Sequence, residues 1–193
     1  MIDYKFYYWG PFITKMKIPE TGVKEILKYC KKEKLHNSRL AGILKQQYRF
    51  NDEVFLKCLS PYFDAYLEGA QEHYGIKNIS NKLEIKESWV NFMKKNEFNP
   101  PHIHSFDIGC VLYLKIPKNL KKENELYEGV SGGPGCIEFR YGEMNNKLFK
   151  VNHYFLPEVG DFYIFPAKLT HFVYPFESDG ERISISANLN IVN

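Results

Sequence analysis

The segment RISISANLNIV, residues 182–192, alternates between polar and apolar side chains along almost its whole length. A period of two residues is typical of a β-strand, in which successive side chains point to opposite faces. One face then carries Ile183, Ile185, Ala187, Leu189 and Ile191, and the other carries Arg182, Ser184, Ser186, Asn188 and Asn190. An arginine inside a β-protein is costly unless its guanidinium meets an anion, and its planar fork fits a carboxylate. The polar face of this strand is therefore expected to line a pocket.

The rest of the chain after residue 80 also predicts strands. Short runs rich in aromatic and β-branched residues follow one another, separated by Gly, Pro, Asn or charged residues: KLEIKESWVNFM, GCVLYLKIP, GCIEFRYG, KLFKVNHYFLP, DFYIFP and HFVYPF. Such a succession without intervening helices predicts an antiparallel sandwich or barrel, such as a jelly roll. The polar, Gly-rich segment 118–135 is expected to be a long loop.

The first 80 residues are expected to contribute a strand and a helical buttress. In residues 21–34, apolar side chains recur at i, i+3, i+4 and i+7, which predicts one apolar stripe on a helix. A second helical region is predicted from about residue 52 to residue 74, ending at Gly75. Within it, the pair Ser60-Pro61 predicts a break or kink.

Composition places the chain among ordinary globular proteins and excludes few functions. Its 193 residues, 44% hydrophobic and 25% charged, predict a single domain spanning residues 1–193. A net charge of +3 gives no indication of nucleic-acid binding, and the oligomeric state is not indicated. No signal peptide is visible and no apolar run approaches the roughly 20 residues of a bilayer crossing, so a cytoplasmic location is expected.

Two histidines stand directly before a predicted strand, in NPPHIHSFDIGCVLYLKIP, residues 99–117. On an extended backbone His102 and His104 point the same way and can grip one metal ion, and Asp107 follows closely with a carboxylate. His171 lies in another predicted strand, which a rolled sheet can bring to the same end. Taken singly, these residues also fit a surface loop and a packed strand. The other histidines are expected at the surface: His36, His73 and His153.

The combined pattern resembles the 2-oxoglutarate and Fe(II)-dependent oxygenase superfamily, over roughly residues 88–193, and most of all a small branch often carried by bacterial viruses. The shared elements are His-x-His before a strand, the phrase PEVGDFYIFPAKLTHFVYP, and His171 followed after ten residues by Arg-Ile-Ser. The resemblance implies a double-stranded β-helix, that is, a cupin-like jelly roll in residues 81–193 buttressed by residues 1–80. It also implies Fe(II) and 2-oxoglutarate as cofactors.

The resemblance assigns roles to individual residues. His171 would be the distal metal ligand. Arg182 would bind the far carboxylate of 2-oxoglutarate, with Ser184 assisting. Tyr113 would contact the same carboxylate, and Asn91 would line the pocket. No catalytic residue is expected beyond the metal ligands.

The sequence departs from the superfamily in its proximal motif, which is usually His-x-Asp or His-x-Glu. Here it is His102-Ile103-His104. His104 could take the place of the carboxylate, Asp107 could reach the metal, or Asp107 could orient a ligand from outside the coordination sphere. We expect His102, His104 and His171 around the iron, with Asp107 as the alternative.

The function expected from this resemblance is hydroxylation by a 2-oxoglutarate-dependent Fe(II) dioxygenase, with release of succinate and CO2. A protein side chain, a nucleobase and a small metabolite all stay open as its substrate. Two alternatives also remain. Three histidines can hold zinc in a hydrolase-type site, and a jelly roll that lacks the usual carboxylate ligand can be a non-catalytic binding module.

Overall fold

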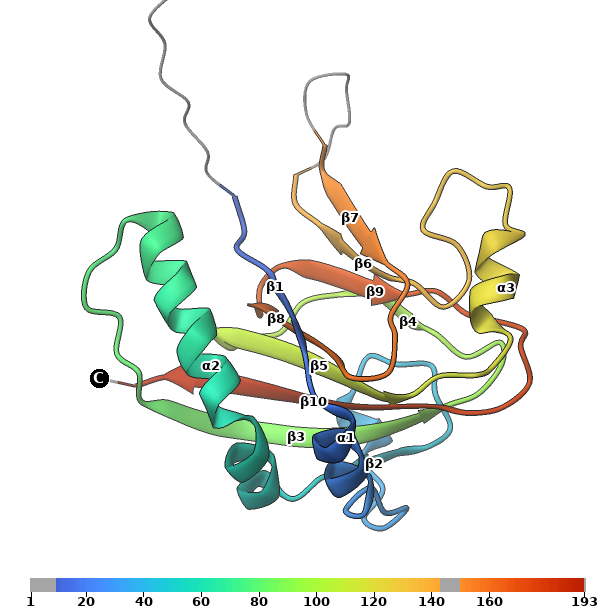
Figure 1. Cartoon of the computed structure of the whole chain (residues 1–193), viewed down its shortest axis with the longest axis horizontal. Coiled ribbons are helices and arrows are strands. Elements are labelled where there is room, and N and C mark those ends of the chain that lie inside the picture. The colour runs from blue at the N-terminus through green and yellow to red at the C-terminus, as the bar shows by residue number, and fades with distance from the viewer. Residues whose placement is uncertain (1–9, 143–149, 193) are drawn as a thin grey trace, which may run out of the picture.

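The computed structural model describes residues 10–142 and 150–192, and within them the strands form two antiparallel sheets (Figure 1). The six-stranded sheet has the order β1 (Thr14–Lys17), β8 (Asp161–Pro166), β5 (Ile108–Lys115), β10 (Arg182–Ile191), β3 (Leu83–Met93) and β2 (Gln47–Arg49). The four-stranded sheet has the order β4 (Asn99–His102), β9 (Thr170–Val173), β6 (Ile137–Arg140) and β7 (Asn152–Phe155). This architecture confirms the expected mainly β fold with N-terminal helices.

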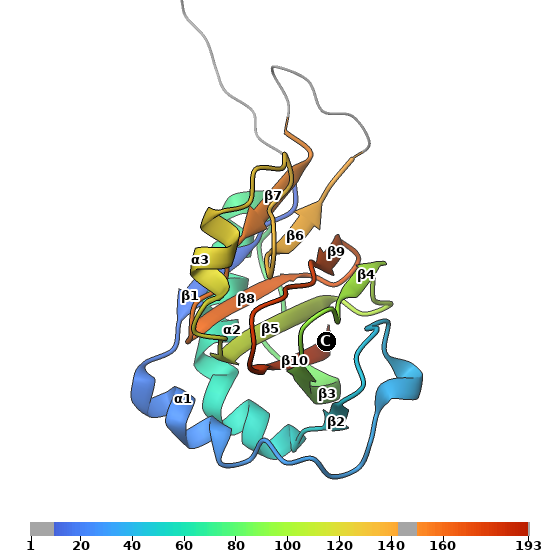
Figure 2. The same ribbon diagram turned by 90° about the vertical axis from the view of Figure 1, so that its right-hand side faces the viewer.

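Three α-helices and one short 3-10 helix accompany the sheets. They are α1 (Glu20–Leu27), α2 (Asp52–Tyr74), α3 (Leu120–Glu125) and the 3-10 helix Asn37–Arg39. Figure 2 shows α1 and α2 on the side of the large sheet that faces away from the small sheet. No helix in the described ranges combines the length and hydropathy of a membrane span.

Two hydrophobic clusters occupy the two sides of the large sheet. The outer cluster joins α1 and α2 to the sheet, and Phe55, Leu59 and Phe63 from α2 are almost completely buried in it. The inner cluster lies between the sheets and contains Tyr113 and Tyr163 from the large sheet and Phe139 from the small one. The large sheet therefore packs against the helices on one side and against the small sheet on the other.

Strand β10 has the alternation that its sequence predicts. Ile183, Ile185, Ala187 and Leu189 all lie in the outer cluster under the helices. Arg182, Ser184, Ser186 and Asn188 all line a pocket between the sheets. The polar face of this strand thus lines a pocket, as expected.

The structure refines two sequence predictions. Of the break or kink predicted at Ser60-Pro61, the break is absent, because helix α2 runs continuously through Pro61 to Tyr74. Proline removes one helical hydrogen bond, and burial of apolar residues on both sides of it, such as Leu59 and Phe63, holds the helix together. The predicted loop 118–135 also contains the short helix α3, whose Leu120 is fully buried.

Candidate metal centre and adjoining pocket

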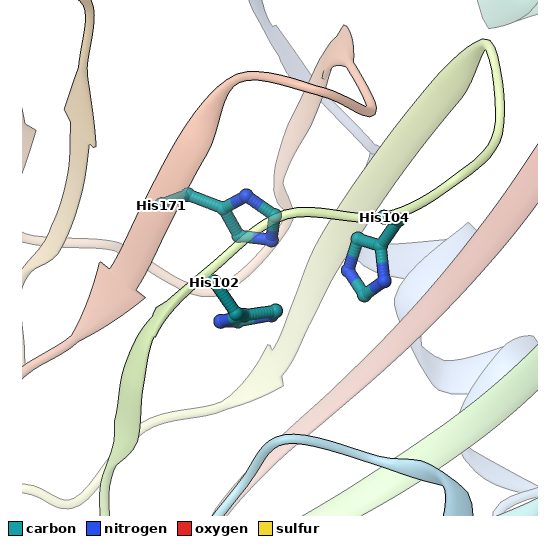
Figure 3. Close-up of side chains that lie close together, drawn as sticks. All are labelled: His102, His104 and His171. Atoms are coloured by element: carbon teal, nitrogen blue, oxygen red, sulfur yellow. The ribbon is translucent and has the colours of Figure 1, made fainter.

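Three histidines meet at one end of the pocket (Figure 3). His102 ends β4 and lies opposite His171 of β9 in the sheet register, and His104 follows in the connection to β5. Their ring centroids are 4.3 Å (102 to 171), 5.0 Å (102 to 104) and 5.1 Å (104 to 171) apart. One nitrogen from each ring lies within 4.8 Å of the others, so the cluster could hold a metal ion.

Local backbone features explain how these rings converge. Pro100 and Pro101 precede His102 in β4, which is an edge strand, the place in a sheet that tolerates proline. The N–H of His104 donates to the carbonyl of Ala167 at 2.9 Å, which ties its loop to the turn before β9. The ring of His171 packs on that of Phe165, with centroids 4.7 Å apart.

Backbone carbonyls orient two of the rings. Nδ1 of His102 donates to the carbonyl of Pro100 at 2.7 Å, and Nδ1 of His171 donates to that of Leu169 at 2.8 Å. A carbonyl oxygen can only accept, so in a neutral ring the lone pair lies on Nε2. This arrangement is the one that metal-binding histidines use, because the second nitrogen is fixed by a protein partner.

Burial keeps the three imidazoles of the cluster in their neutral form. Burial, followed by the effect of His102, lowers the pKa of His171 to about 3. Burial and again His102 lower the pKa of His104 to about 4, and burial lowers that of His102. All three rings are neutral near pH 7, which is the state that binds metal.

Asp107 is not part of this cluster. Its carboxylate is exposed and accepts a hydrogen bond from the N–H of Ile191 at 2.9 Å. Among the described residues, the group with metal-ligand spacing consists of the three histidines alone. The structure therefore brings together His102, His104 and His171 and leaves Asp107 at a strand end.

Arg182 lies further along the pocket and is buried, with 3% of its surface exposed. One terminal nitrogen donates to the carbonyl of Gly135 at 2.9 Å and the other faces the sulfur of Met93, while Nε has no partner. No acidic side chain pairs with it among the residues described. Burial lowers its pKa, yet a guanidinium keeps its charge in proteins. A buried cation of this kind calls for an anionic ligand.

Tyr113 and Asn91 lie beside Arg182 on the pocket wall. The Tyr113 ring lies 5.4 Å from the guanidinium carbon, and its hydroxyl is buried without a hydrogen-bond partner. Burial raises the pKa of Tyr113 to about 12, so the hydroxyl can donate. Asn91 donates to the hydroxyl of Ser184 at 3.4 Å. The pocket therefore offers unused donors around Arg182.

Sequence reasoning missed two groups that support the site. Gln47 of β2 is buried and donates to Asn91 at 2.8 Å. His36 was expected at the surface and is instead 9% exposed, with its Nε2 3.3 Å from the carboxylate of Glu87. His36 lies in a polar stretch, and the sequence around Gln47 gives no signal that this polar residue is buried. His153, by contrast, is exposed as expected.

Comparison with known proteins gives one family match. A family model described as "Putative 2OG-Fe(II) oxygenase" matches residues 87–188, which are 102 of the 193 residues. The match includes every histidine of the cluster and Arg182. Curated proteins yield no match to this chain.

Several solved structures share the fold. A prolyl-4-hydroxylase from Pseudomonas putida has a TM-score of 0.63 at 15% identity, covering 94% of this chain and 93% of its own. A viral collagen prolyl hydroxylase from Paramecium bursaria Chlorella virus-1, in complex with 2-oxoglutarate, has a TM-score of 0.59 at 16% identity, covering 95% and 98%. HygX from Streptomyces hygroscopicus, with nickel, 2-oxoglutarate and hygromycin B bound, has a TM-score of 0.55 at 11% identity, covering 92% and 82%. At these identities the similarity establishes the jelly-roll fold.

Proposed function

The chain belongs to the 2OG-Fe(II) oxygenase family, whose cofactors are Fe(II) and 2-oxoglutarate, and from this premise we propose that it is a dioxygenase that hydroxylates its substrate and releases succinate and CO2. The observation that carries the proposal is the pairing of two unusual features in one pocket. A cluster of neutral imidazoles lies at one end, and a buried arginine without a carboxylate partner lies further along the wall.

His102, His104 and His171 would hold the iron. Imidazole nitrogen is a suitable ligand for iron, and the fixed Nδ1 atoms of His102 and His171 leave Nε2 available. Three neutral ligands leave the full charge of Fe(II) uncompensated by the protein. The anionic cosubstrate would therefore supply the negative charge that a carboxylate ligand gives in most relatives.

Arg182 would bind the far carboxylate of 2-oxoglutarate. The fit rests on unused donors in this structure, namely Nε of Arg182 and the hydroxyl of Tyr113. A charge-assisted pair with a carboxylate would satisfy both and would offset the cost of burying the guanidinium. Asn91 and Ser184 would complete this end of the pocket.

The cofactors and the protein would have different roles in the reaction. Bound Fe(II) and 2-oxoglutarate supply the oxidation, in which O2 provides one oxygen atom to succinate and one to the hydroxylated product. The chain would bind and orient these groups, and the side chains of Tyr113, Ile137 and Phe165 on the pocket wall would exclude water.

Binding and turnover test the proposal separately. Under argon, the purified protein should bind 2-oxoglutarate in the presence of Fe(II) and develop a visible charge-transfer band. Under oxygen, with candidate substrates that include prolyl peptides, nucleosides and small metabolites, it should release succinate in step with product. Calorimetry with N-oxalylglycine, which resembles 2-oxoglutarate, provides an independent measure of the pocket.

The alternatives predict different results. A non-catalytic binding module would bind 2-oxoglutarate but release no succinate with any substrate. A hydrolase-type site would copurify with zinc, and 2-oxoglutarate would neither bind nor raise its thermal stability. Either pattern would contradict the proposed oxygenase.

A further inference from the structure

A hydrogen-bonded chain of side chains runs from His36, which lies beside the edge strand β2, to His104. Nε2 of His36 lies 3.3 Å from one carboxylate oxygen of Glu87, and the other oxygen accepts a hydrogen bond from Nδ2 of Asn188 at 2.9 Å. The same Nδ2 lies 3.3 Å from Nδ1 of His104. Asn188 is completely buried, and its Oδ1 has no partner.

Glu87 determines which end of the Asn188 amide faces the ring. A carboxylate can only accept hydrogen bonds, so the NH2 group of Asn188 must face it. Turning the amide over would place Oδ1 against the carboxylate in a buried site, at the cost of a repulsive contact. The two hydrogens of Nδ2 are therefore directed to Glu87 and to Nδ1 of His104.

We infer that Asn188, held by Glu87, is a positioning residue that keeps metal-free His104 in the opposite tautomer from His102 and His171. Since Nδ1 of His104 faces a donor, it carries the lone pair and Nε2 carries the proton. The other two rings have the proton on Nδ1, where a carbonyl accepts it. Figure 3 shows one nitrogen of His104 turned toward the other two rings and the second turned away from them.

The consequence concerns metal binding and rests on the proposed function. For His104 to bind iron through Nε2, its proton must move to Nδ1, and Asn188 must then present Oδ1 and give up its bond to Glu87. His104 would therefore be the one ligand of the three that binds iron only after this proton shift. Glu87 would oppose metal binding through this amide, although its negative charge alone would attract a cation.

Nitrogen-15 NMR of the metal-free full chain, labelled at histidine and recorded near neutral pH, tests the tautomers directly. We expect Nδ1–H for His102 and His171 and Nε2–H for His104. In Glu87→Gln the new amide can donate to Oδ1 of Asn188, so the Asn188 amide turns over and His104 changes to Nδ1–H. An Nδ1–H tautomer for His104 in the wild type would overturn the inference.

Titration with Fe(II) under argon tests whether Glu87, acting through Asn188, weakens metal binding by the histidine cluster. Glu87→Gln should bind Fe(II) about tenfold more tightly than the wild type, in the range known for residues that orient metal ligands. The matched control is Glu84→Gln, which removes the same charge from β3 at an exposed position paired with Lys86. An affinity no higher than in this control would overturn the coupling. If no variant binds Fe(II) while the tautomers are as stated, the tautomer inference is supported and the proposed metal centre is wrong.

Discussion

Arg182 and Tyr113 each keep a buried hydrogen-bonding atom without a partner, which is rare in a folded protein because the desolvation cost is not recovered. The cost is understandable when the partner is a ligand. Nε of Arg182 and the hydroxyl of Tyr113 are therefore the two donors that suit this part of the pocket to an anionic ligand.

Replacing Arg182 by alanine should weaken 2-oxoglutarate binding by about tenfold or more, because a charge-assisted contact contributes about 1.5–3 kcal/mol. Isothermal titration with Fe(II)-loaded protein under argon measures the change. Arg49→Ala is the matched control, because Arg49 pairs with Asp52 on β2 and α2, outside the pocket. Equal affinities in the two variants would exclude Arg182 as the carboxylate receptor.

Metal retention should distinguish His171 from Asp107. His171→Ala should lose bound Fe(II) or a Co(II) probe, whereas Asp107→Ala should keep it and lose only the bond to Ile191, worth about 1 kcal/mol. Metal analysis after desalting, with the exposed His153→Ala as control, gives the answer. Loss of metal in Asp107→Ala would restore the carboxylate to the coordination sphere.

The sequence predicts the histidines and the arginine of the site better than it predicts the residues that hold them in place. His-x-His and the spacing of His171 to Arg182 are local patterns, and the structure places them around one pocket. His36 and Glu87 are 51 residues apart, and only the fold brings them together. Side-chain hydrogen bonds between distant segments leave no periodic signal in a sequence.

At the scale of elements, β1 pairs with β8 at the edge of the large sheet, and Asp161 of β8 adds two ion pairs to this pairing. The Asp161 carboxylate lies 2.9 Å from Nζ of Lys15 and 3.0 Å from Nζ of Lys17. Burial raises the pKa of Asp161, but the hydrogen bond from the N–H of Glu158 and those from both lysines outweigh it. The pKa therefore lies below its ordinary value.

A pKa that is lower in the folded state gives stability that is complete above the ordinary pKa of about 4 and is lost as the pH falls below it. The free energy of unfolding should therefore fall in this acidic range, and Asp161→Asn should show a shallower fall. Urea denaturation at a series of pH values measures both slopes, and Asp64→Asn, at an exposed position on α2, is the control. Identical slopes for Asp161→Asn and the wild type would contradict this account.

Periodicity predicts the strands and the helices α1 and α2 because each buries one face, although α1 ends at Leu27, before the end of the predicted segment 21–34. It fails at α3, which is only six residues long. The pair Ser60-Pro61 does not break α2, because tertiary packing outweighs the cost of proline. It also does not show that β1 and β2, from the N-terminal part, extend the large sheet at both of its edges. Strand pairing between distant segments depends on the whole fold.

At the scale of the whole molecule, the outer hydrophobic cluster and the pocket lie on opposite sides of the large sheet. Phe63→Ala, in the outer cluster, should lower the free energy of unfolding by about 3–5 kcal/mol because it leaves a cavity in a closely packed core. The Fe(II) affinity of the folded fraction should stay within about twofold of the wild type, since additivity holds for distant sites. A parallel loss of affinity in a sample shown to be folded would mean that the helices control the site.

Alternate residues of strand β10 face the helices and the pocket, so this strand contributes both to the outer cluster and to the pocket. Substitutions at its inward positions can alter what the protein recognises and leave its outward packing intact. A single inserted or deleted residue would exchange the two faces at once, placing Arg182's neighbours under the helices and isoleucines in the pocket. Over evolutionary time this strand should accept changes of residue while its length stays fixed.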